Sequence, residues 1–315
     1  MKLIIQIPCL NEEKTLPATL QDLPQQIDGV DSIEILVIDD GSTDRTLAVA
    51  QEHKVHHVLQ LTNNKGLAKA FIFGINHALK MGADIIVNTD ADNQYCGEDI
   101  PQLIRPILEG KADIVIGDRQ VETIRHFSPL KILLQKFGSW VVRQLSGTSV
   151  PDATSGFRAY SREAALQLNV ISDFTYTVET IISAGKKNLA IAHVPVKTNR
   201  KLRESRLFPN IRTYLQRTLV TIIKVYSMYK PLKVFTIAGG LAFVTGFGIG
   251  CRYLYFFFQG RTEGHIQSLI LSAILLIVGF QIIMMGIAAE LISVNRQILE
   301  DIQVRVKKNE YESRD

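Results

Sequence analysis

Short apolar runs alternate with segments of helical periodicity over residues 1–120. The strand-like runs are residues 2–8, 33–39, 55–61, 85–90 and 114–118, and the helical patterns are residues 13–23, 43–52, 66–81 and 98–109. This alternation predicts an α/β fold with a mainly parallel sheet covered on both faces. Ligands bind such sheets beyond the carboxyl ends of the strands, where Pro8, Asp39, Asp90 and Asp118 stand.

Two long apolar segments follow this α/β pattern. Residues 234–258 contain a single charged residue, Arg252, and residues 266–292 contain only Glu290. Each segment exceeds the roughly 20 residues that cross a bilayer, and residues 259–265 form a short connection between them. The alternative is a pair of buried helices in a soluble core, but globular helices of this length usually carry a polar face. We therefore expect a transmembrane hairpin.

Basic residues gather at the ends of this hairpin. Lysines and arginines precede and follow it at Arg212, Arg217, Lys224, Lys230, Lys233, Arg296, Arg305, Lys307 and Lys308, whereas the connecting loop offers only Arg261. The positive-inside rule therefore predicts that the N-terminal domain and both termini are cytoplasmic. Residues 209–228 combine an apolar stripe with a basic face, which is typical of an amphipathic helix at the membrane surface or of a core-facing helix.

Composition excludes several function classes. The formal net charge of +4 is too small to indicate nucleic-acid binding. Cys9, Cys96 and Cys251 lack metal-type spacing, so they predict neither a disulfide framework nor a zinc site and fit a reduced cytoplasmic protein. The G-x-G-x-x-G and G-x-x-x-x-G-K-[ST] phosphate loops are absent. A nucleotide site would then depend on carboxylates and a metal.

A compact set of oxygen donors follows the apolar run at residues 85–87. It is Asp90-Ala91-Asp92-Asn93-Gln94, with two carboxylates one residue apart and a side-chain amide. Hard donors of this kind suit Mg²⁺ or Mn²⁺, which keep open positions for phosphate oxygens. An acidic loop at a strand end is the alternative reading.

Seven motifs in a fixed order resemble one known family. They are Pro8–Glu13, Val37–Asp44, Asn64–Gly66, Asp90–Gln94, Gly117–Arg119, Asp152–Arg158 and Arg200–Leu207. Together they resemble the family 2 glycosyltransferases of GT-A fold, and among these the polyisoprenyl-phosphate glycosyltransferases of the dolichyl-phosphate mannosyltransferase type. The resemblance implies a Rossmann-like, cytoplasmic GT-A domain over residues 1–207, an amphipathic juxtamembrane helix over 208–232, two transmembrane helices within 233–293 and a basic cytoplasmic tail over 294–315.

The resemblance implies a set of donor-binding residues. These are Pro8, Leu10, Glu12, Asp39, Asp40, Asp90, Ala91, Asp92, Arg119, Arg200 and Arg206, with Asp90, Asp92 and Gln94 as metal ligands. Asp39 and Asp40 would hold the nucleoside, although Asp40 could instead cap the helix after Gly41. Arg119 would donate to the leaving diphosphate or form a structural salt bridge.

The sequence departs from the family pattern at four positions. Leu10 replaces an aromatic residue, and Asn93 replaces an apolar one, so that it either faces solvent or touches the sugar. In the motif that usually reads R-x-x-G-E-S-K-L, Arg203 replaces the glycine and Arg206 the lysine. The resemblance implies that Arg200 and Arg206 meet the donor and acceptor phosphates, and solvated surface arginines are the alternative.

The implied reaction is inverting transfer of a hexose from a nucleoside diphosphate sugar, UDP-glucose or GDP-mannose, to a polyprenyl phosphate at the cytoplasmic membrane face. The catalytic residues would be Asp92, Arg119 and Asp152. A phosphate monoester has a second pKa of about 6, so a strong base is unnecessary. Asp152 is then a base, an acceptor-orienting group or a structural carboxylate. Ser155, Arg158, Lys131 and Arg143 are acceptor-phosphate candidates.

Three other functions are alternatives to this one. A processive polysaccharide synthase would carry Q-x-x-R-W, but Trp140 follows Gly138-Ser139. Transfer to a soluble or protein acceptor and a non-catalytic membrane scaffold are further alternatives. The family implies a homo-oligomer, and the G-x-x-x-G formed by Gly246 and Gly250 could pack within the hairpin or between subunits.

Overall fold

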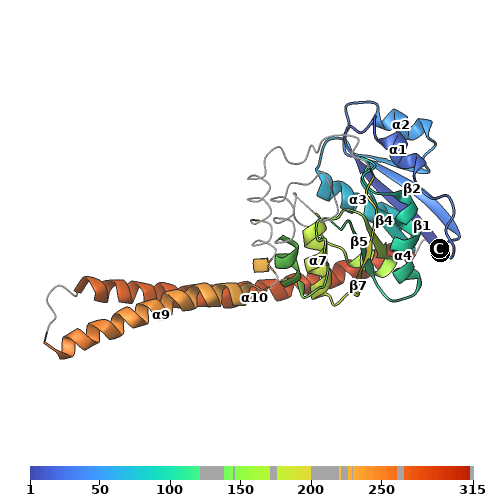
Figure 1. Ribbon diagram of the computed structural model, residues 1–315. Coiled ribbons are helices and arrows are strands. Elements are labelled where there is room, and N and C mark those ends of the chain that lie inside the picture. The colour runs from blue at the N-terminus through green and yellow to red at the C-terminus, as the bar shows by residue number, and fades with distance from the viewer. Residues whose placement is uncertain are drawn as a thin grey trace. The chain divides into compact units, whose positions relative to one another are not determined.

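The computed structural model describes residues 1–120, 138–144, 146–170, 176–199, 220, 226–228, 230–260 and 266–312 (Figure 1). The chain divides into two compact units, one formed by Met1–Ile222 with Gln303–Asp315 and the other by Ile223–Ile302. Most of the predicted amphipathic helix at residues 209–228 lies outside the described residues, as do Lys131, Arg200 and Arg206.

The described part of the first unit contains a seven-stranded sheet in the order β3-β2-β1-β4-β6-β5-β7. Its strands are β1 (Lys2–Cys9), β2 (Ser32–Asp39), β3 (His57–Gln60), β4 (Ile85–Asn88), β5 (Ile114–Asp118), β6 (Arg158–Ser161) and β7 (Ile191–Pro195). Only β6 runs antiparallel among these strands, between β4 and β5. The predicted mainly parallel α/β sheet is therefore confirmed.

Helices cover both faces of the sheet (Figure 1). They are α1 (Leu16–Gln21), α2 (Thr46–Glu52), α3 (Leu67–Lys80), the 3₁₀ turn η1 (Gly97–Asp99), α4 (Ile100–Leu108), α6 (Arg162–Gln167) and α7 (Tyr176–Lys186). Leu3, Ile5 and Ile7 of β1 pack in one core with Leu16 and Leu103. The alternate β1 residues face α3, whose Gly74 leaves room for the Gln6 side chain. Burial on both faces explains why β1 is apolar at nearly every position after Lys2, with Gln6 as the exception.

The second unit is built on two long helices, α9 (Pro231–Phe258) and α10 (Ile266–Glu312). Both are long and apolar enough to cross a membrane, and only 11% and 17% of their most apolar windows are buried. Side chains of this kind are stable against lipid but not against water. α10 extends well beyond the predicted span at 266–292, so residues 294–312 of the predicted tail continue the helix.

The G-x-x-x-G of α9 packs against α10. A Cβ atom on Gly246 would lie 2.8 Å from the Leu275 Cβ, and one on Gly250 would lie 2.8 Å from the Ser272 Oγ. The Ser272 hydroxyl donates to the Gly246 carbonyl oxygen over 2.7 Å. These small residues let the two backbones approach closely, so the motif serves contact within the hairpin.

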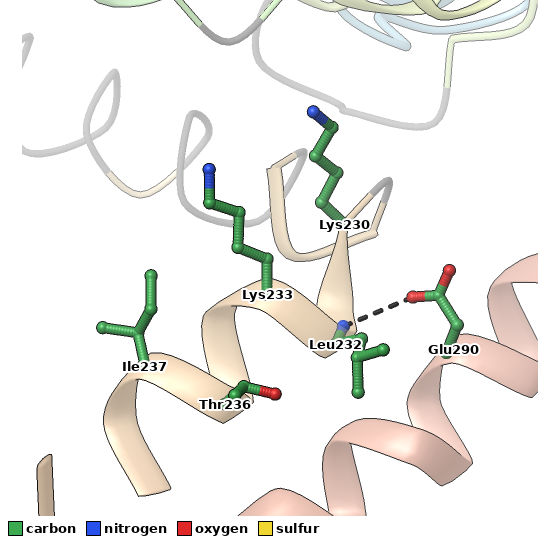
Figure 2. Close-up of a pocket in the computed structure, with 6 residues that line it drawn as sticks. All are labelled: Lys230, Leu232, Lys233, Thr236, Ile237 and Glu290. Atoms are coloured by element: carbon green, nitrogen blue, oxygen red, sulfur yellow. Dashed lines mark hydrogen bonds between the residues drawn. The ribbon is translucent and has the colours of Figure 1, made fainter. Parts of the chain in front are cut away.

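Glu290, the only acidic residue of the second apolar segment, has a partner in α9. The Leu232 N–H donates to the Glu290 Oε2 over 3.3 Å (Figure 2). N–H groups in the first turn of a helix have no partner within that helix, and a carboxylate there is further favoured by the helix dipole. Lys230 and Lys233 line the same surface hollow. Glu290 therefore stabilises the start of α9.

Candidate active site

The candidate site lies where four strands end at one edge of the sheet. The register pairs Cys9 with Asp39 and Gln6 with Asn88, so β1, β2 and β4 end near the same level. Asp118 ends β5, and Asp90 follows β4 by two residues. The motif residues that follow these strands therefore gather at a common edge, as the sequence predicts.

The loops after β1 and β2 are joined by hydrogen bonds. Asn11 donates its backbone N–H to the Ser42 Oγ over 2.9 Å and accepts from the Thr43 N–H over 2.8 Å. Glu12 donates its N–H to the Thr46 Oγ1 over 2.7 Å. Gly41 has a φ of 77°, and a Cβ there would lie 2.7 Å from a backbone carbon of Asn63. These hydrogen bonds fix the loop after β1, which carries Leu10 and Glu12 of the predicted donor-binding set, against the loop after β2.

The paired carboxylates Asp39 and Asp40 make different contacts. The Asp39 Oδ1 accepts the Ser42 N–H over 3.0 Å. Asp40 instead accepts the N–H groups of Lys65 and Gly66 over 2.7 and 2.9 Å, one with each oxygen. Asp40 therefore anchors the loop that enters α3. The expected alternative, a cap on the helix after Gly41, is not formed, because α2 begins only at Thr46 and its cap is Arg45.

The candidate metal-binding turn, residues 90–94, has a defined backbone shape. The Asp92 Oδ1 accepts the Gln94 N–H over 3.1 Å. Asn93 has a φ of 53°, in the left-handed region that asparagine adopts more readily than apolar residues do. The Asn93 Oδ1 also accepts from the Asn199 Nδ2 over 3.4 Å. Asn93 therefore shapes the turn that carries Asp92, a role that its position in the motif did not indicate.

Gly156 leaves the space beside the Asp90 carboxylate. A Cβ on Gly156 would lie 3.1 Å from both Asp90 oxygens and 3.0 Å from the Tyr176 hydroxyl. The Gly156 N–H donates to the Tyr95 hydroxyl, and its carbonyl accepts from the Asn88 Nδ2, each over 2.9 Å. Burial raises the pKa of Tyr95 to about 12. The phenol is therefore neutral at physiological pH.

This arrangement fits a divalent cation that is shared with substrate. Among the described residues, no cluster of three or more histidine, cysteine or acidic side chains could hold a metal alone. Asp90 and Asp92 are half-buried, and the missing Gly156 side chain leaves space at Asp90. Two carboxylates and the Gln94 amide would bind Mg²⁺ or Mn²⁺ with positions left for phosphate oxygens and water.

A buried polar network behind Asp90 was not predicted from the sequence. The Gln6 Nε2 donates to the Asn88 Oδ1, and the Asn88 Nδ2 donates to the Tyr176 hydroxyl, each over 2.9 Å. The Tyr176 ring stacks on Phe71 with centroids 4.0 Å apart. A signal was present in the sequence, because Gln6 and Asn88 are polar residues within otherwise apolar strands. Buried amides at such positions need partners.

Arg119 and Asp152 form a buried bidentate ion pair. The Arg119 Nε and Nη2 donate to the two Asp152 oxygens over 2.7 and 3.0 Å, and Nη2 also donates to the Thr154 Oγ1. Burial alone would raise the pKa of Asp152, but the Arg119 guanidinium outweighs it, so that this pKa lies below its usual value. An ionised carboxylate that is engaged in this way is a poor general base and a good orienting group for Arg119.

The structure gives the acceptor-phosphate candidates different surroundings. Arg158 is 0% exposed and donates to the carbonyls of Ser155, Thr177 and Ala153 and to the Thr180 hydroxyl. These contacts favour a structural role for Arg158 and do not support the predicted phosphate contact. Ser155 is also fully buried, and the half-buried Arg143 donates to the Val150 carbonyl.

Comparisons with known proteins agree with this geometry. Residues 4–168 match the family described as Glycosyl transferase family 2, and residues 230–294 match the GtrB C-terminal hairpin. The UDP-N-acetylglucosamine--dolichyl-phosphate N-acetylglucosaminyltransferase of Methanococcus voltae is 32% identical over 61% of this chain and 83% of its own. The undecaprenyl-phosphate mannosyltransferase of Micrococcus luteus is 31% identical over 66% of this chain and 88% of its own.

A similar fold occurs in a solved structure. Glucosyl-3-phosphoglycerate synthase from Mycobacterium tuberculosis, crystallised with Mn²⁺, UDP and glucosyl-3-phosphoglycerate, superimposes with a TM-score of 0.54 over 72% of this chain and 78% of its own at 20% identity. This likeness concerns the fold. The family match, by contrast, spans more than half of the sequence and contains the strand-end motifs described above. The protein is thus a glycosyltransferase that belongs to glycosyl transferase family 2.

Proposed function

We propose that the protein transfers a hexose from a nucleoside diphosphate sugar to the phosphate of a polyprenyl phosphate, with inversion at the anomeric carbon. The proposal rests on the combination of two features in one chain. A carboxylate turn lies at the edge of a GT-A sheet, and two candidate membrane helices follow it in the sequence. The two relatives named above act, by their names, on dolichyl phosphate and undecaprenyl phosphate. Their names give different sugars, N-acetylglucosamine and mannose, and so fix no single donor for this chain. We propose UDP-glucose or GDP-mannose as the donor.

The donor diphosphate would bind through the 90–94 turn and Arg119. Asp90, Asp92 and Gln94 would hold Mg²⁺ or Mn²⁺, and the similar synthase from Mycobacterium tuberculosis was crystallised with Mn²⁺ and UDP. A bound cation supplies neutralisation of the negative charge on the leaving nucleotide. Arg119 adds a cationic donor whose guanidinium plane is fixed by Asp152 before substrate arrives. A preorganised donor costs no reorganisation during the reaction.

The acceptor needs little activation by the protein. A lipid phosphate monoester is largely anionic at neutral pH because its second pKa is about 6. Its oxygen can attack the anomeric carbon directly, so the protein has to position it and to stabilise charge. We assign Asp152 to the orientation of Arg119, which agrees with its lowered pKa. Arg200 and Arg206 lie outside the described residues. Their contact with the donor and acceptor phosphates stays a prediction.

We further propose that the first unit, Met1–Ile222 with Gln303–Asp315, which is the catalytic unit in this proposal, faces the cytoplasm. Lys230 and Lys233 lie at the start of α9 (Figure 2). In the connection between the two apolar segments, residues 259–265, Arg261 is the only lysine or arginine. Lysines at this position attract anionic phospholipid headgroups on the cytoplasmic leaflet. A catalytic unit on that side would meet both a soluble nucleotide sugar and a lipid phosphate.

The experiment that tests this function uses the full chain in vesicles that contain a polyprenyl phosphate. A panel of radiolabelled UDP and GDP sugars is supplied with Mg²⁺ or Mn²⁺, and the products are extracted with organic solvent. We expect one donor to label the lipid fraction, and mild acid should release the labelled sugar from that lipid. Label confined to aqueous or protein fractions would contradict the lipid acceptor, and no transfer from any donor would contradict the proposed donor class.

A further inference from the structure

The segment after β7 contacts the candidate metal-binding turn. Thr198 forms a β-bridge with Tyr95, and the Asn199 N–H donates to the Gln94 carbonyl oxygen over 2.9 Å. Two residues before Asn199, the Lys197 N–H donates to the Asp99 Oδ2 over 2.6 Å. The chain therefore runs along residues 94–99 and follows the turn that carries Asp92.

The Asn199 side chain reaches three acceptors around this turn. Its Nδ2 lies 3.4 Å from the Asn93 Oδ1, 3.3 Å from the Tyr95 carbonyl oxygen and 3.3 Å from the Asp22 Oδ2. A side-chain amide nitrogen is a donor with two hydrogens, so it suits a site that presents several acceptors. Asn199 thus contacts residues 93, 94 and 95 in succession and fixes the backbone immediately after Asp92.

Asp22, at the end of α1, contacts the same part of the chain from the side opposite Asn199. Its Oδ2 also accepts the Gly97 N–H over 2.6 Å, and a Cβ on Gly97 would collide with the Asp22 carbonyl oxygen. One turn earlier in α1, the Thr19 hydroxyl donates to the Ala91 carbonyl oxygen over 3.1 Å. The metal-binding turn is therefore held at residue 91 and again at residues 93–97.

We infer that Asn199, together with Asp22, is a positioning pair for the metal site. Neither side chain belongs to the proposed donor-binding set, and each acts through the backbone that carries Asp92 and Gln94. Metal sites depend on such supporting contacts, and their loss typically weakens metal binding by 10- to 100-fold. The inference rests on the proposed function, because it takes residues 90–94 as the cation site.

Asn199→Ala tests this role in the full-length protein. Binding of Mn²⁺ is followed by electron paramagnetic resonance in the presence of UDP and, separately, of GDP, and the melting temperature is measured alongside. We expect the Mn²⁺ concentration for half-saturation to rise about tenfold. The donor KM should rise with it, and kcat at saturating Mn²⁺ should change much less. Gln51→Ala, which removes an exposed amide from α2, is the matched control and should leave the Mn²⁺ half-saturation, the melting temperature, KM and kcat unchanged.

An isosteric variant separates positioning from folding. Asn199→Asp keeps the side-chain shape but presents an acceptor to the Asp22 carboxylate, so it should weaken Mn²⁺ binding at least as much as alanine does. The double variant Asn199→Asp with Asp22→Asn again pairs a side-chain donor at one position with an acceptor at the other. It should recover part of the lost Mn²⁺ affinity. If Asn199→Ala fails to fold, the single and double variants still test whether Asn199 positions the metal site.

The outcomes distinguish this inference from the proposed function. If the wild-type protein binds Mn²⁺ with neither UDP nor GDP, the proposed donor site is wrong and the positioning role falls with it. If the wild type binds Mn²⁺, and both Asn199→Ala and Asn199→Asp reach half-saturation at the wild-type Mn²⁺ concentration, the positioning role is wrong and the donor site stands. A lowered melting temperature with unchanged Mn²⁺ binding would likewise leave Asn199 with a structural role only.

Discussion

Gly156 lies against the carboxylate of Asp90, so that a Cβ atom on the glycine would approach both carboxylate oxygens to 3.1 Å. The two residues come from different parts of the sheet edge, since Asp90 follows β4 and Gly156 precedes the antiparallel strand β6. The glycine is fixed by Tyr95 and Asn88 and cannot move aside freely. Space at the first carboxylate of the metal turn is therefore set by a residue 66 positions later in the chain.

The first prediction concerns this contact. Gly156→Ala should displace the Asp90 carboxylate or the Tyr176 hydroxyl, because the new Cβ would lie within 3.1 Å of each. Overpacking of this kind costs about 1–3 kcal/mol of stability. We measure kcat/KM for sugar transfer and the melting temperature of the variant. The kcat/KM should fall strongly even at temperatures where the variant is still fully folded. Gly138→Ala meets no neighbouring atom and serves as the control. Wild-type activity in Gly156→Ala would show that Asp90 is not needed in its present position.

The second prediction concerns the second carboxylate of the turn. Asp92→Asn keeps the side-chain shape and an oxygen that can still accept the Gln94 N–H. It removes the negative charge that would hold the cation, so transfer should fall about a hundredfold or more at unchanged fold. The measurement is sugar transfer at a series of Mg²⁺ and Mn²⁺ concentrations, with circular dichroism to verify folding. Asp28→Asn, at an exposed position, is the control. Near wild-type transfer would remove Asp92 from the metal site.

The third prediction concerns the Arg119–Asp152 ion pair. Asp152→Asn leaves the buried guanidinium without its counter-charge, and breaking a buried pair typically costs about 3–5 kcal/mol. The melting temperature in detergent should therefore fall, and kcat should fall because Arg119 loses its orientation. If kcat depended on Asp152 as a general base, the pH–rate profile would lose a limb in the variant. We expect its shape to stay the same.

The same pair predicts how stability depends on pH. The pKa of Asp152 is lowered in the folded protein, because Arg119 outweighs the effect of burial. Its stabilising contribution is therefore fully present above the unfolded value of about 3.9 and is lost as the pH falls through the folded pKa. The wild-type melting temperature should drop more steeply on acidification below pH 4 than that of Asp152→Asn. Parallel curves for the two proteins would contradict the lowered pKa.

The sequence predicted much of this architecture because the central strands are buried on both faces. β1, β2, β4 and β5 are found within two residues of their predicted ends, since each reads as a short apolar run. β6 was missed because only four residues form it and Arg158 begins it. The burial of Arg158 depends on carbonyl groups from the 153–155 loop and from α7, and a one-dimensional pattern does not reveal such partners.

The site was predicted at the level of motifs but not of contacts. The resemblance located the carboxylates, whereas Asn93 was explained only by its φ of 53° and Asp40 only by its bonds to Lys65 and Gly66. Both depend on how two loops meet in space. Asn199 carried no motif signal at all, because its function follows from backbone groups at residues 94 and 95, which any sequence would supply.

The last prediction concerns the end of α10, whose residues from Gln303 onward belong to the catalytic unit. Tyr311 is only 8% exposed there, with the Lys80 ammonium 5.9 Å from its ring centroid. Lys308 pairs with Glu163 of α6, and Glu310 pairs with Lys80 of α3. The ion pairs are partly exposed and add little stability, whereas the buried ring adds more.

Tyr311→Ala should therefore lower the free energy of unfolding of the catalytic unit by about 2–4 kcal/mol, because it removes a buried aromatic side chain at one edge of the unit. Lys308→Ala and Val306→Ala, at half-buried and exposed positions of the same helix, should each cost less than about 1 kcal/mol. Urea unfolding of the detergent-solubilised full chain, followed through a fluorophore attached to the catalytic unit, provides the measurement. A loss for Lys308→Ala as large as that for Tyr311→Ala, with Val306→Ala close to wild type, would mean that charge, and not burial of Tyr311, holds the end of α10 to α3 and α6.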